Sequence, residues 1–296
     1  MSRQYAENHL GLPLPLWRAL TTDTYNPSGD HSVSQLIVPP QVRWLEQRHD
    51  HKIVHNPLRN SYSLKGKAFH AFMEQFADED TMIFEERFQE EIDGFQISGQ
   101  PDLLILAGGV LWDYKECSVY VMSYGAKAEW EQQMNCYAEL IRRRGYTVKE
   151  LKIAAHFRDW SAVRQAHTKD YPADPFAVFQ LEMWERFECE AFMQSRIALH
   201  EESRNLPDEE LPPCSSDERW QRNAWAVIKK GGKRATKNFK DYKEAKKFLA
   251  TLDDAYEIQP RSGETIRCTY FCTTGMAGFC TQYNAEREAA QEKSNE

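Results

Sequence analysis

The sequence has no long apolar run, no excess of positive charge and no charged-then-apolar pattern at its N-terminus. No uninterrupted apolar stretch approaches the roughly 20 residues that span a bilayer, so a membrane partner is not expected. The opening residues, MSRQYAENHLGLPLPLW, lack the arrangement of a secretory signal. The formal net charge of −8 argues against a surface coated with basic groups. These absences favour a cytoplasmic protein.

Cysteine occurs seven times, and an odd number does not suggest a disulfide framework. Cys117, Cys136 and Cys189 stand in apolar or helical contexts and are expected to be buried as small hydrophobic residues. The other four lie late in the chain, at Cys214, Cys268, Cys272 and Cys280. Four thiolates suit a [4Fe–4S] cluster or Zn²⁺, although zinc sites usually show tighter C-x2-C pairs. Ordinary reduced cysteines are the alternative.

The order of predicted elements is helix, strand, hairpin, helix, strand, helix. This order indicates an α/β fold, with a mixed central sheet and helices on both faces. Helices are expected over 63–79, 127–144 and 175–204, strands over 83–92 and 151–157, and a hairpin over 95–117. The expected parts of the chain are an N-terminal helical region 1–62, a core 63–205, a cysteine-containing accessory region 206–285 and a flexible tail 286–296.

Two carboxylates and one ammonium stand in the otherwise apolar segment SGQPDLLILAGGVLWDYKECS, residues 98–118. A two-residue turn at Gly108-Gly109 would place Asp102 directly across from Lys115. Because side chains alternate along a strand, Asp113 would share that face. Two carboxylates at a covered edge repel each other unless a cation lies between them, and Mg²⁺ or Mn²⁺ suits their oxygens. The alternative is a salt bridge from Asp102 to Lys115 and a spare surface aspartate.

This segment and its neighbours resemble the RecB-like branch of the PD-(D/E)xK nuclease superfamily, which includes the CRISPR adaptation nucleases and the AddB group. The matching residues, in the order of that branch, are His70, Pro101-Asp102, Asp113-Tyr114-Lys115, Gln133 and Tyr137. Gln133 and Tyr137 form its Q-x-x-x-Y pair, whose i, i+4 spacing puts both side chains on one helical face. The resemblance covers about residues 63–160 and implies a restriction-endonuclease-like core.

The resemblance implies metal-dependent hydrolysis of DNA, as an exonuclease in recombination, repair or phage DNA processing. The implied ligands of Mg²⁺ or Mn²⁺ are His70, Asp102, Asp113 and the backbone carbonyl of Tyr114. Lys115 would position the attacking water or stabilise charge on the phosphate, and Gln133 and Tyr137 would orient Lys115 or the DNA. Glu86 and Glu91, on the preceding predicted strand, are candidates for a further acidic ligand.

The late cysteines extend the same resemblance. Many RecB-like exonucleases carry a four-cysteine iron–sulfur cluster with three C-terminal cysteines, so [4Fe–4S] is expected here and Zn²⁺ is the alternative. This chain differs in that its first cysteine, Cys214, follows the nuclease motifs and its spacings are wider. The run of LPPC, a basic hairpin and a cysteine trio looks like phage-encoded RecB-like proteins, whose compartment would be the cytoplasm of a bacterial host.

Positive charge is concentrated in residues 228–247, where nine Lys or Arg stand against two acidic residues, so the rest of the chain carries about −15. The residues expected to touch the DNA backbone without reading its sequence are Lys229, Lys230, Lys233, Arg234 and Lys237, together with Arg158 after the strand 151–157. A solvated lysine-rich hairpin and helix is the alternative for the segment, and an ion pair with Asp159 is the alternative for Arg158.

The expected partner is DNA, single-stranded or with duplex ends; a recombination protein or helicase and the oligomeric state are left open. The competing function is a catalytically inactive DNA-binding or assembly protein that keeps the fold and a structural iron–sulfur or zinc site. The acidic surface outside 228–247 leaves room for that second function, whereas intact Asp102, Asp113 and Lys115 favour the enzyme.

Overall fold

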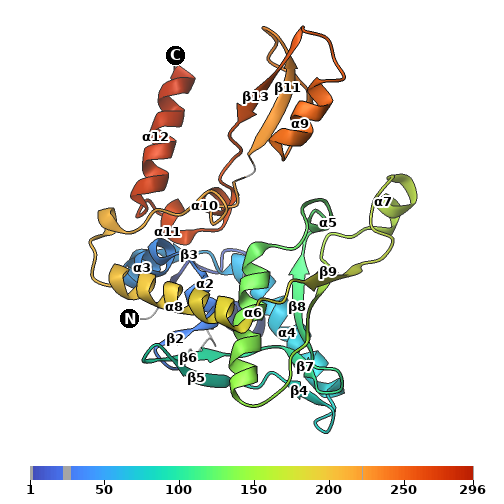
Figure 1. The fold of residues 1–296 in the computed structure, drawn as a ribbon. Coiled ribbons are helices and arrows are strands. Elements are labelled where there is room, and N and C mark those ends of the chain that lie inside the picture. Colours follow the sequence, from blue (N-terminus) through green and yellow to red (C-terminus); the bar gives the residue numbers. More distant parts are fainter. Residues whose placement is uncertain (1–2, 23–27, 222, 296) are drawn as a thin grey trace. The chain divides into compact units, whose positions relative to one another are not determined.

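The computed structural model describes residues 3–22, 28–221 and 223–295 (Figure 1). The chain forms two compact units, which are described separately. The core unit comprises Gln4–Val38 and Val54–Arg204, and the cysteine unit comprises Met1–Arg3, Pro39–Ile53 and Asn205–Glu296. The boundary at 205 agrees with the predicted start of the accessory region. The predicted N-terminal region 1–62 is not a unit of its own, because the chain changes unit at the Pro39-Pro40 break and returns after Ile53.

The core unit contains a five-stranded sheet in the order β10-β9-β8-β7-β4. Its strands are β4 (Met82–Phe84), β7 (Leu103–Ile105), β8 (Val110–Cys117), β9 (Glu150–Phe157) and β10 (Phe176–Leu181). Strands β8 and β9 are parallel, and the other three pairs are antiparallel. The sheet is therefore mixed, and with the helices packed on it the chain has the predicted α/β fold.

The parallel pair needs a crossover, which helix α6 (Ala128–Arg143) supplies, as predicted for 127–144. Gly145 ends the helix with φ of +89°. Side chains of β9 alternate strictly, with Leu151, Ile153 and Phe157 among the buried set beneath α6. This face of the sheet and α6 form the main hydrophobic core (Figure 1).

A second sheet of the core unit has the order β2-β6-β5, formed by β2 (His31–Ser32), β6 (Phe95–Gly99) and β5 (Phe88–Ile92). Helices α2 (Val33–Ile37) and α8 (Arg186–Ser203) pack together beside it. Gly99 ends β6 where the Tyr137 ring of α6 approaches, and a Cβ there would lie 2.8 Å from that ring. The glycine therefore allows α6 to seat Tyr137 against the sheet.

The helix predicted over 175–204 is two elements, β10 followed by α8. The first six residues, FAVFQL, alternate between exposed and less exposed side chains and pair with β9 in continuous register. Helix α8 begins only after Glu185, whose side chain accepts from the backbone and forms a capping box with Glu188. The apolar run is compatible with either the helical or the strand period, and its pairing with β9 makes it a strand.

The strand predicted over 83–92 is also two elements. Strand β4 ends at Phe84, Glu85 has φ of +50°, and β5 begins at Phe88 in the other sheet. The preceding helix, predicted over 63–79, is α4 (Ser61–Met73) with a 3₁₀ turn to Phe76. Helix α4 is not part of the core, because it has no buried residue, and Phe72 and Phe76 are exposed.

The remaining elements of the core unit are short. They are β1 (Gln4–Tyr5), α1 (Leu14–Thr21), β3 (Val54–His55), the 3₁₀ turn Pro57–Asn60, α5 (Val121–Tyr124) and α7 (Ala162–His167). Strands β1 and β3 pair in parallel as a separate two-stranded ribbon. Among the described helices of either unit, none combines the length and the apolar character needed to cross a bilayer.

The cysteine unit contains an antiparallel sheet in the order β12-β11-β13. The predicted hairpin is β11 (Ala224–Lys229) and β12 (Ala235–Phe239), followed by the predicted helix α9 (Tyr242–Leu249) and an additional strand β13 (Tyr256–Arg261). The other elements are α3 (Pro40–His49), 3₁₀ turns at Asp50–Lys52 and Asp208–Glu210, α10 (Ile266–Tyr270), α11 (Thr273–Met276) and α12 (Thr281–Asn295). The tail predicted as flexible from 286 is therefore the body of a helix.

Candidate active site

The hairpin that carries the two aspartates has a four-residue loop, Leu106–Gly109, in place of the predicted two-residue turn. Both loop glycines have positive φ, +93° at Gly108 and +67° at Gly109. Leu103 pairs with Trp112, so Asp102 lies level with Asp113 and not with Lys115 as predicted. Because the loop is still even in length, the two carboxylates keep the predicted common side.

Lys115 is held between β8 and α6. Its Nζ lies 2.6 Å from Asp113 Oδ2 and donates a 3.0 Å hydrogen bond to Gln133 Oε1. Gln133 in turn donates from Nε2 to the Tyr137 hydroxyl at 2.9 Å. The structure thus brings Asp113, Gln133 and Tyr137 together around the Lys115 ammonium. The i, i+4 pair of α6 fixes the direction in which Lys115 points.

Asp102 connects β8 to α4. Its Oδ2 accepts a 2.6 Å hydrogen bond from the backbone N–H of Tyr114, and its Oδ1 lies 3.6 Å from His70 Nδ1. The N–H and C=O of one strand residue point to the same edge, so the Tyr114 carbonyl also faces the edge where Asp102 lies. His70, Asp102 and the Tyr114 backbone are therefore neighbours, as the sequence predicted.

Glu85 is a member of this group that sequence reasoning missed. His70 Nδ1 lies 2.5 Å from Glu85 Oε1, and Gln100 Nε2 donates to Glu85 Oε2 at 3.0 Å. The backbone N–H of Glu85 donates to the Asp102 carbonyl at 3.1 Å. The candidates proposed from sequence, Glu86 and Glu91, are both exposed and neither belongs to the group. Only the left-handed backbone at Glu85 turns its carboxylate inward, and no periodicity reveals that.

The ligand atoms of His70, Glu85 and Asp102 all lie within 4.8 Å of one another, and this is the metal-compatible cluster found among the described residues. One imidazole and two carboxylates suit Mn²⁺, and Mg²⁺ through the oxygens. Asp113 is not within this cluster, since its carboxylate contacts Lys115. Its predicted role as a metal ligand, like that of the Tyr114 carbonyl, stays a prediction.

Burial and neighbouring charge shift the acid–base behaviour of these groups. Burial, followed by repulsion from Asp113, raises the pKa of Asp102 to about 7. The hydrogen bond to Glu85 raises the pKa of His70. Burial opposes the charged form of Lys115, but the adjoining Asp113 carboxylate outweighs it and raises the pKa of the ammonium. The site without a cation therefore holds protons that a cation would displace.

Binding of Mn²⁺ is expected to strengthen as pH rises from about 5 to 7, because both Asp102 and His70, whose pKa values are raised, must lose a proton to bind the cation. Asp102 must lose its proton to bind a cation, and below its pKa near 7 each displaced proton weakens binding by about tenfold per pH unit. Titration calorimetry across this range measures the slope. The variant Asp102→Asn should bind more weakly with a slope lower by about one proton; an affinity of the wild type that does not change with pH would contradict the assignment.

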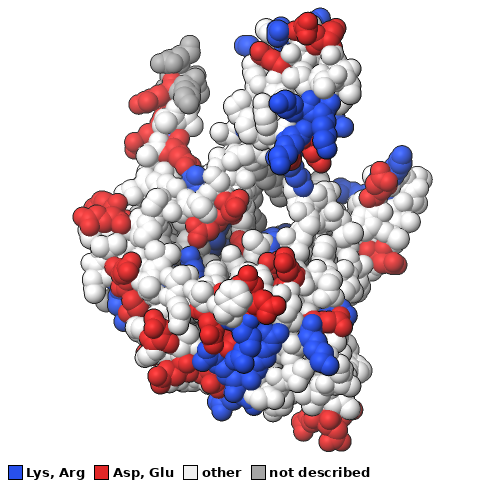
Figure 2. Space-filling view, in the orientation of Figure 1, with Lys and Arg blue, Asp and Glu red and all other residues white. Residues whose placement is uncertain are grey.

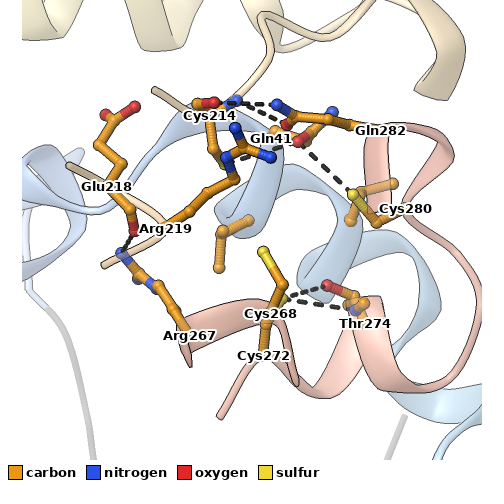
Figure 3. A pocket seen from close by; sticks show the side chains of 13 residues that line it. Gln41, Cys214, Glu218, Arg219, Arg267, Cys268, Cys272, Thr274, Cys280 and Gln282 are labelled. Carbon is orange, nitrogen blue, oxygen red and sulfur yellow. Dashed lines mark hydrogen bonds between the residues drawn. The ribbon is translucent and has the colours of Figure 1, made fainter. Parts of the chain in front are cut away.

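The four late cysteines line one pocket of the cysteine unit (Figure 3). Cys214 follows the 3₁₀ turn Asp208–Glu210, Cys268 lies in α10, Cys272 caps α11, and Cys280 precedes α12. All four are buried and reduced. The amide oxygen of Gln41, from α3, accepts from the thiols of Cys214 at 3.5 Å and Cys280 at 3.6 Å. The predicted set is thus brought together from segments far apart in the sequence.

The donor chemistry of this pocket fits a metal group. Burial raises the pKa of Cys214 to about 12 and that of Cys268 to about 11, so the thiols bind protons unless a cation replaces them. A single Zn²⁺ at 2.3 Å from each sulfur would hold the sulfurs about 3.8 Å apart. Among the described residues, no three of these sulfurs lie within 4.8 Å of one another. Four thiolates suit a [4Fe–4S] cluster or Zn²⁺.

Cys117, Cys136 and Cys189 lie apart from this pocket. All three are buried in the hydrophobic core of the core unit, as predicted. Their burial among apolar side chains explains them without any ligand.

The predicted DNA-contacting residues of the cysteine unit are all exposed on and around the β11–β12 turn, namely Lys229, Lys230, Lys233, Arg234 and Lys237. Lys237 Nζ lies over the rings of Phe239 and Phe248, at 5.0 and 5.2 Å. Basic side chains gather over this β-sheet and α9 in Figure 2. In the core unit, Arg158 lies over the Tyr62 ring at 4.8 Å, while Asp159 instead accepts from Ser118 and the Val119 N–H.

Comparison with known proteins gives little. No protein-family model matches the chain, and no curated protein matches it. Among solved structures, the chain is similar to the crystal structure of SSO0001, with a TM-score of 0.43 and 13% sequence identity over 60% of this chain and 79% of that chain.

Proposed function

We propose that the protein is a metal-dependent DNA nuclease that hydrolyses phosphodiester bonds, acting as an exonuclease in DNA recombination, repair or phage DNA processing. The observation that carries the proposal is the convergence of Asp102, Asp113 and Lys115 at one edge of the sheet, beside His70 and Glu85. Groups of this kind, partly removed from water and close enough to perturb one another, are typical of catalytic sites.

His70, Glu85 and Asp102 would hold Mn²⁺ or Mg²⁺, with Asp113 and the Tyr114 carbonyl as the further predicted ligands. When bound, the ion lowers the pKa of a coordinated water and polarises a phosphoryl oxygen. Lys115 would donate to the water or to a phosphate oxygen as negative charge develops there. Gln133 and Tyr137 hold the ammonium in place, which makes them positioning residues.

The four-cysteine pocket is assigned to a structural [4Fe–4S] cluster, with Zn²⁺ as the alternative. Its donors tie the loop at Cys214 to α10, α11 and α12, so the cluster would cross-link the cysteine unit. The exposed cations of the β11–β12 turn and Arg158 would contact the DNA backbone without base readout. A recombination protein or helicase would be a further partner.

Incubation of end-labelled single-stranded and duplex DNA with the purified protein and Mn²⁺ tests the function. Wild type should shorten the DNA, and Lys115→Ala should lower the rate by about 10²- to 10³-fold, the usual effect of removing one donor to developing charge. Lys152→Ala serves as the control, because Lys152 lies on the neighbouring strand over Trp112 and outside the site.

Absence of any Mn²⁺- or Mg²⁺-dependent shortening by wild type would contradict the enzyme. If such a preparation still retained DNA in a mobility-shift assay, the alternative of a catalytically inactive DNA-binding protein with the same fold would replace it.

A further inference from the structure

A cavity of about 260 Å³ opens beside the carboxylate cluster in the core unit. His70 belongs to both, so a molecule in the cavity would lie next to any phosphate held at the cluster. The remaining lining residues are Lys65, Gly66, Phe69, Tyr114, Lys115, Glu116, Ala154 and His156. The proposed function assigns no role to this space.

Four of the nine residues that line the cavity carry aromatic rings. His156 stacks on Phe176 of β10, with ring centroids 4.6 Å apart and planes 22° from parallel. Phe69 lies nearly parallel to His156, at 6.3 Å and 14°, and meets the Tyr114 ring edge-on at 5.5 Å. The rings of Phe69, His156 and Phe176 therefore form a row of flat faces that begins in the cavity. The row ends at Phe176, whose exposed fraction is 50%.

This face of the sheet is incompletely covered. Tyr114 and His156 point to the side opposite the buried face under α6, because side chains alternate along β8 and β9. Helix α4 reaches only part of it (Figure 1). A Cβ at Gly66 would meet nothing within 4 Å, so this glycine borders open space. Exposed aromatic surface at such a position marks a binding site.

We propose that this aromatic cavity binds the unpaired base of a nucleotide adjoining the scissile phosphate, and that it thereby makes single-stranded DNA the preferred substrate. The proposal rests on the proposed nuclease function. A flat base can stack on His156 and Phe69, while Lys65 at the rim supplies positive charge for a flanking phosphate. A base within a duplex is paired and stacked, and would first have to leave the helix at a cost of a few kcal/mol.

The test measures binding without hydrolysis, using a fluorescein-labelled oligodeoxythymidine of about 12 nucleotides in EDTA, and compares it with the same oligonucleotide carrying abasic positions. His156→Ala should weaken binding of the oligodeoxythymidine by about tenfold, the usual effect of losing one stacked base, and Phe176→Ala, which removes the ring stacked behind His156, should also weaken it. Neither should alter binding of the abasic strand, and Phe176→Tyr should restore the affinity. Val178→Ala is the matched control, since Val178 is exposed on the same face of β10 but offers no ring.

Hydrolysis rates then separate the two proposals. With active wild type, Phe176→Ala should lower the ratio of single-strand to duplex cleavage by about the same factor. Unchanged single-strand affinity in both variants, or an equal loss with Val178→Ala, overturns the cavity assignment even if DNA is cut. If the affinity depends on stacking but the protein cuts no DNA, the assignment of the cavity is supported and the proposed nuclease function is overturned.

Discussion

Replacement of Asp102 by asparagine is expected to lower metal-dependent DNA hydrolysis by about 10³-fold and to weaken Mn²⁺ binding. Asp102 is the residue on which the site converges: one oxygen accepts from the Tyr114 N–H, and the other faces His70. Asparagine keeps the shape and an acceptor oxygen, so the effect reports the lost charge. Cleavage assays in Mn²⁺ and calorimetric metal titration measure it.

Glu86→Gln is the control for that variant, because Glu86 is adjacent to Glu85 in sequence but exposed and outside the cluster. It should leave rate and metal affinity unchanged. Thermal unfolding of Asp102→Asn should show a stable protein, since the substitution removes a buried carboxylate that burial and Asp113 disfavour. Wild-type cleavage by Asp102→Asn would show that the metal is held elsewhere and would remove the basis of the proposed mechanism.

Replacement of Cys268 by serine is expected to lower the stability of the cysteine unit by about 3 kcal/mol, because binding of a structural metal group is part of the folding free energy. For a unit of this size the loss corresponds to about 15 °C in Tm. Cys268 lies in α10 and lines the pocket with the other three thiols. The same variant should lose visible iron–sulfur absorbance and bound iron, measured on protein purified without oxygen.

Cys117→Ser is the matched control, because Cys117 and Cys268 are both 7% exposed but Cys117 lies in the core of the core unit. It should keep the iron and the absorbance. Bound zinc in place of iron, lost in Cys268→Ser and kept in Cys117→Ser, would select the alternative metal. Equal stability and no metal in wild type would show that the four thiols are ordinary reduced cysteines.

The prediction that Asp102 and Asp113 lie on a common side is correct, although the predicted length of the loop between their strands is wrong. The loop is four residues long and not two, so Asp102 does not face Lys115. Both lengths are even, however, and the common side of the two carboxylates depends only on that parity. The contact of Lys115 with Gln133 was implied by the resemblance to the RecB-like branch, and helical spacing predicted only that Gln133 and Tyr137 share one face.

Other features depended on long-range packing and could not be read in this way. The segment FAVFQL was assigned to a helix because nothing local revealed its pairing with β9. Phe72 and Phe76 have helical spacing typical of a core, yet both are exposed, because α4 covers the sheet only in part. Glu85 was overlooked because its inward direction comes from one left-handed residue, a backbone state that glutamate rarely adopts.

Glu85 lies at the point where the chain leaves one sheet for another, between β4 of the five-stranded sheet and β5 of the three-stranded sheet. A cation held by Glu85 and Asp102 would cross-link the ends of these two sheets, at the place where the backbone N–H of Glu85 donates to the Asp102 carbonyl. Binding of the ion would then make the two sheets of the core unit more rigid. The catalytic rate and the rigidity of the fold would both increase with metal occupancy and both decrease when the metal is lost.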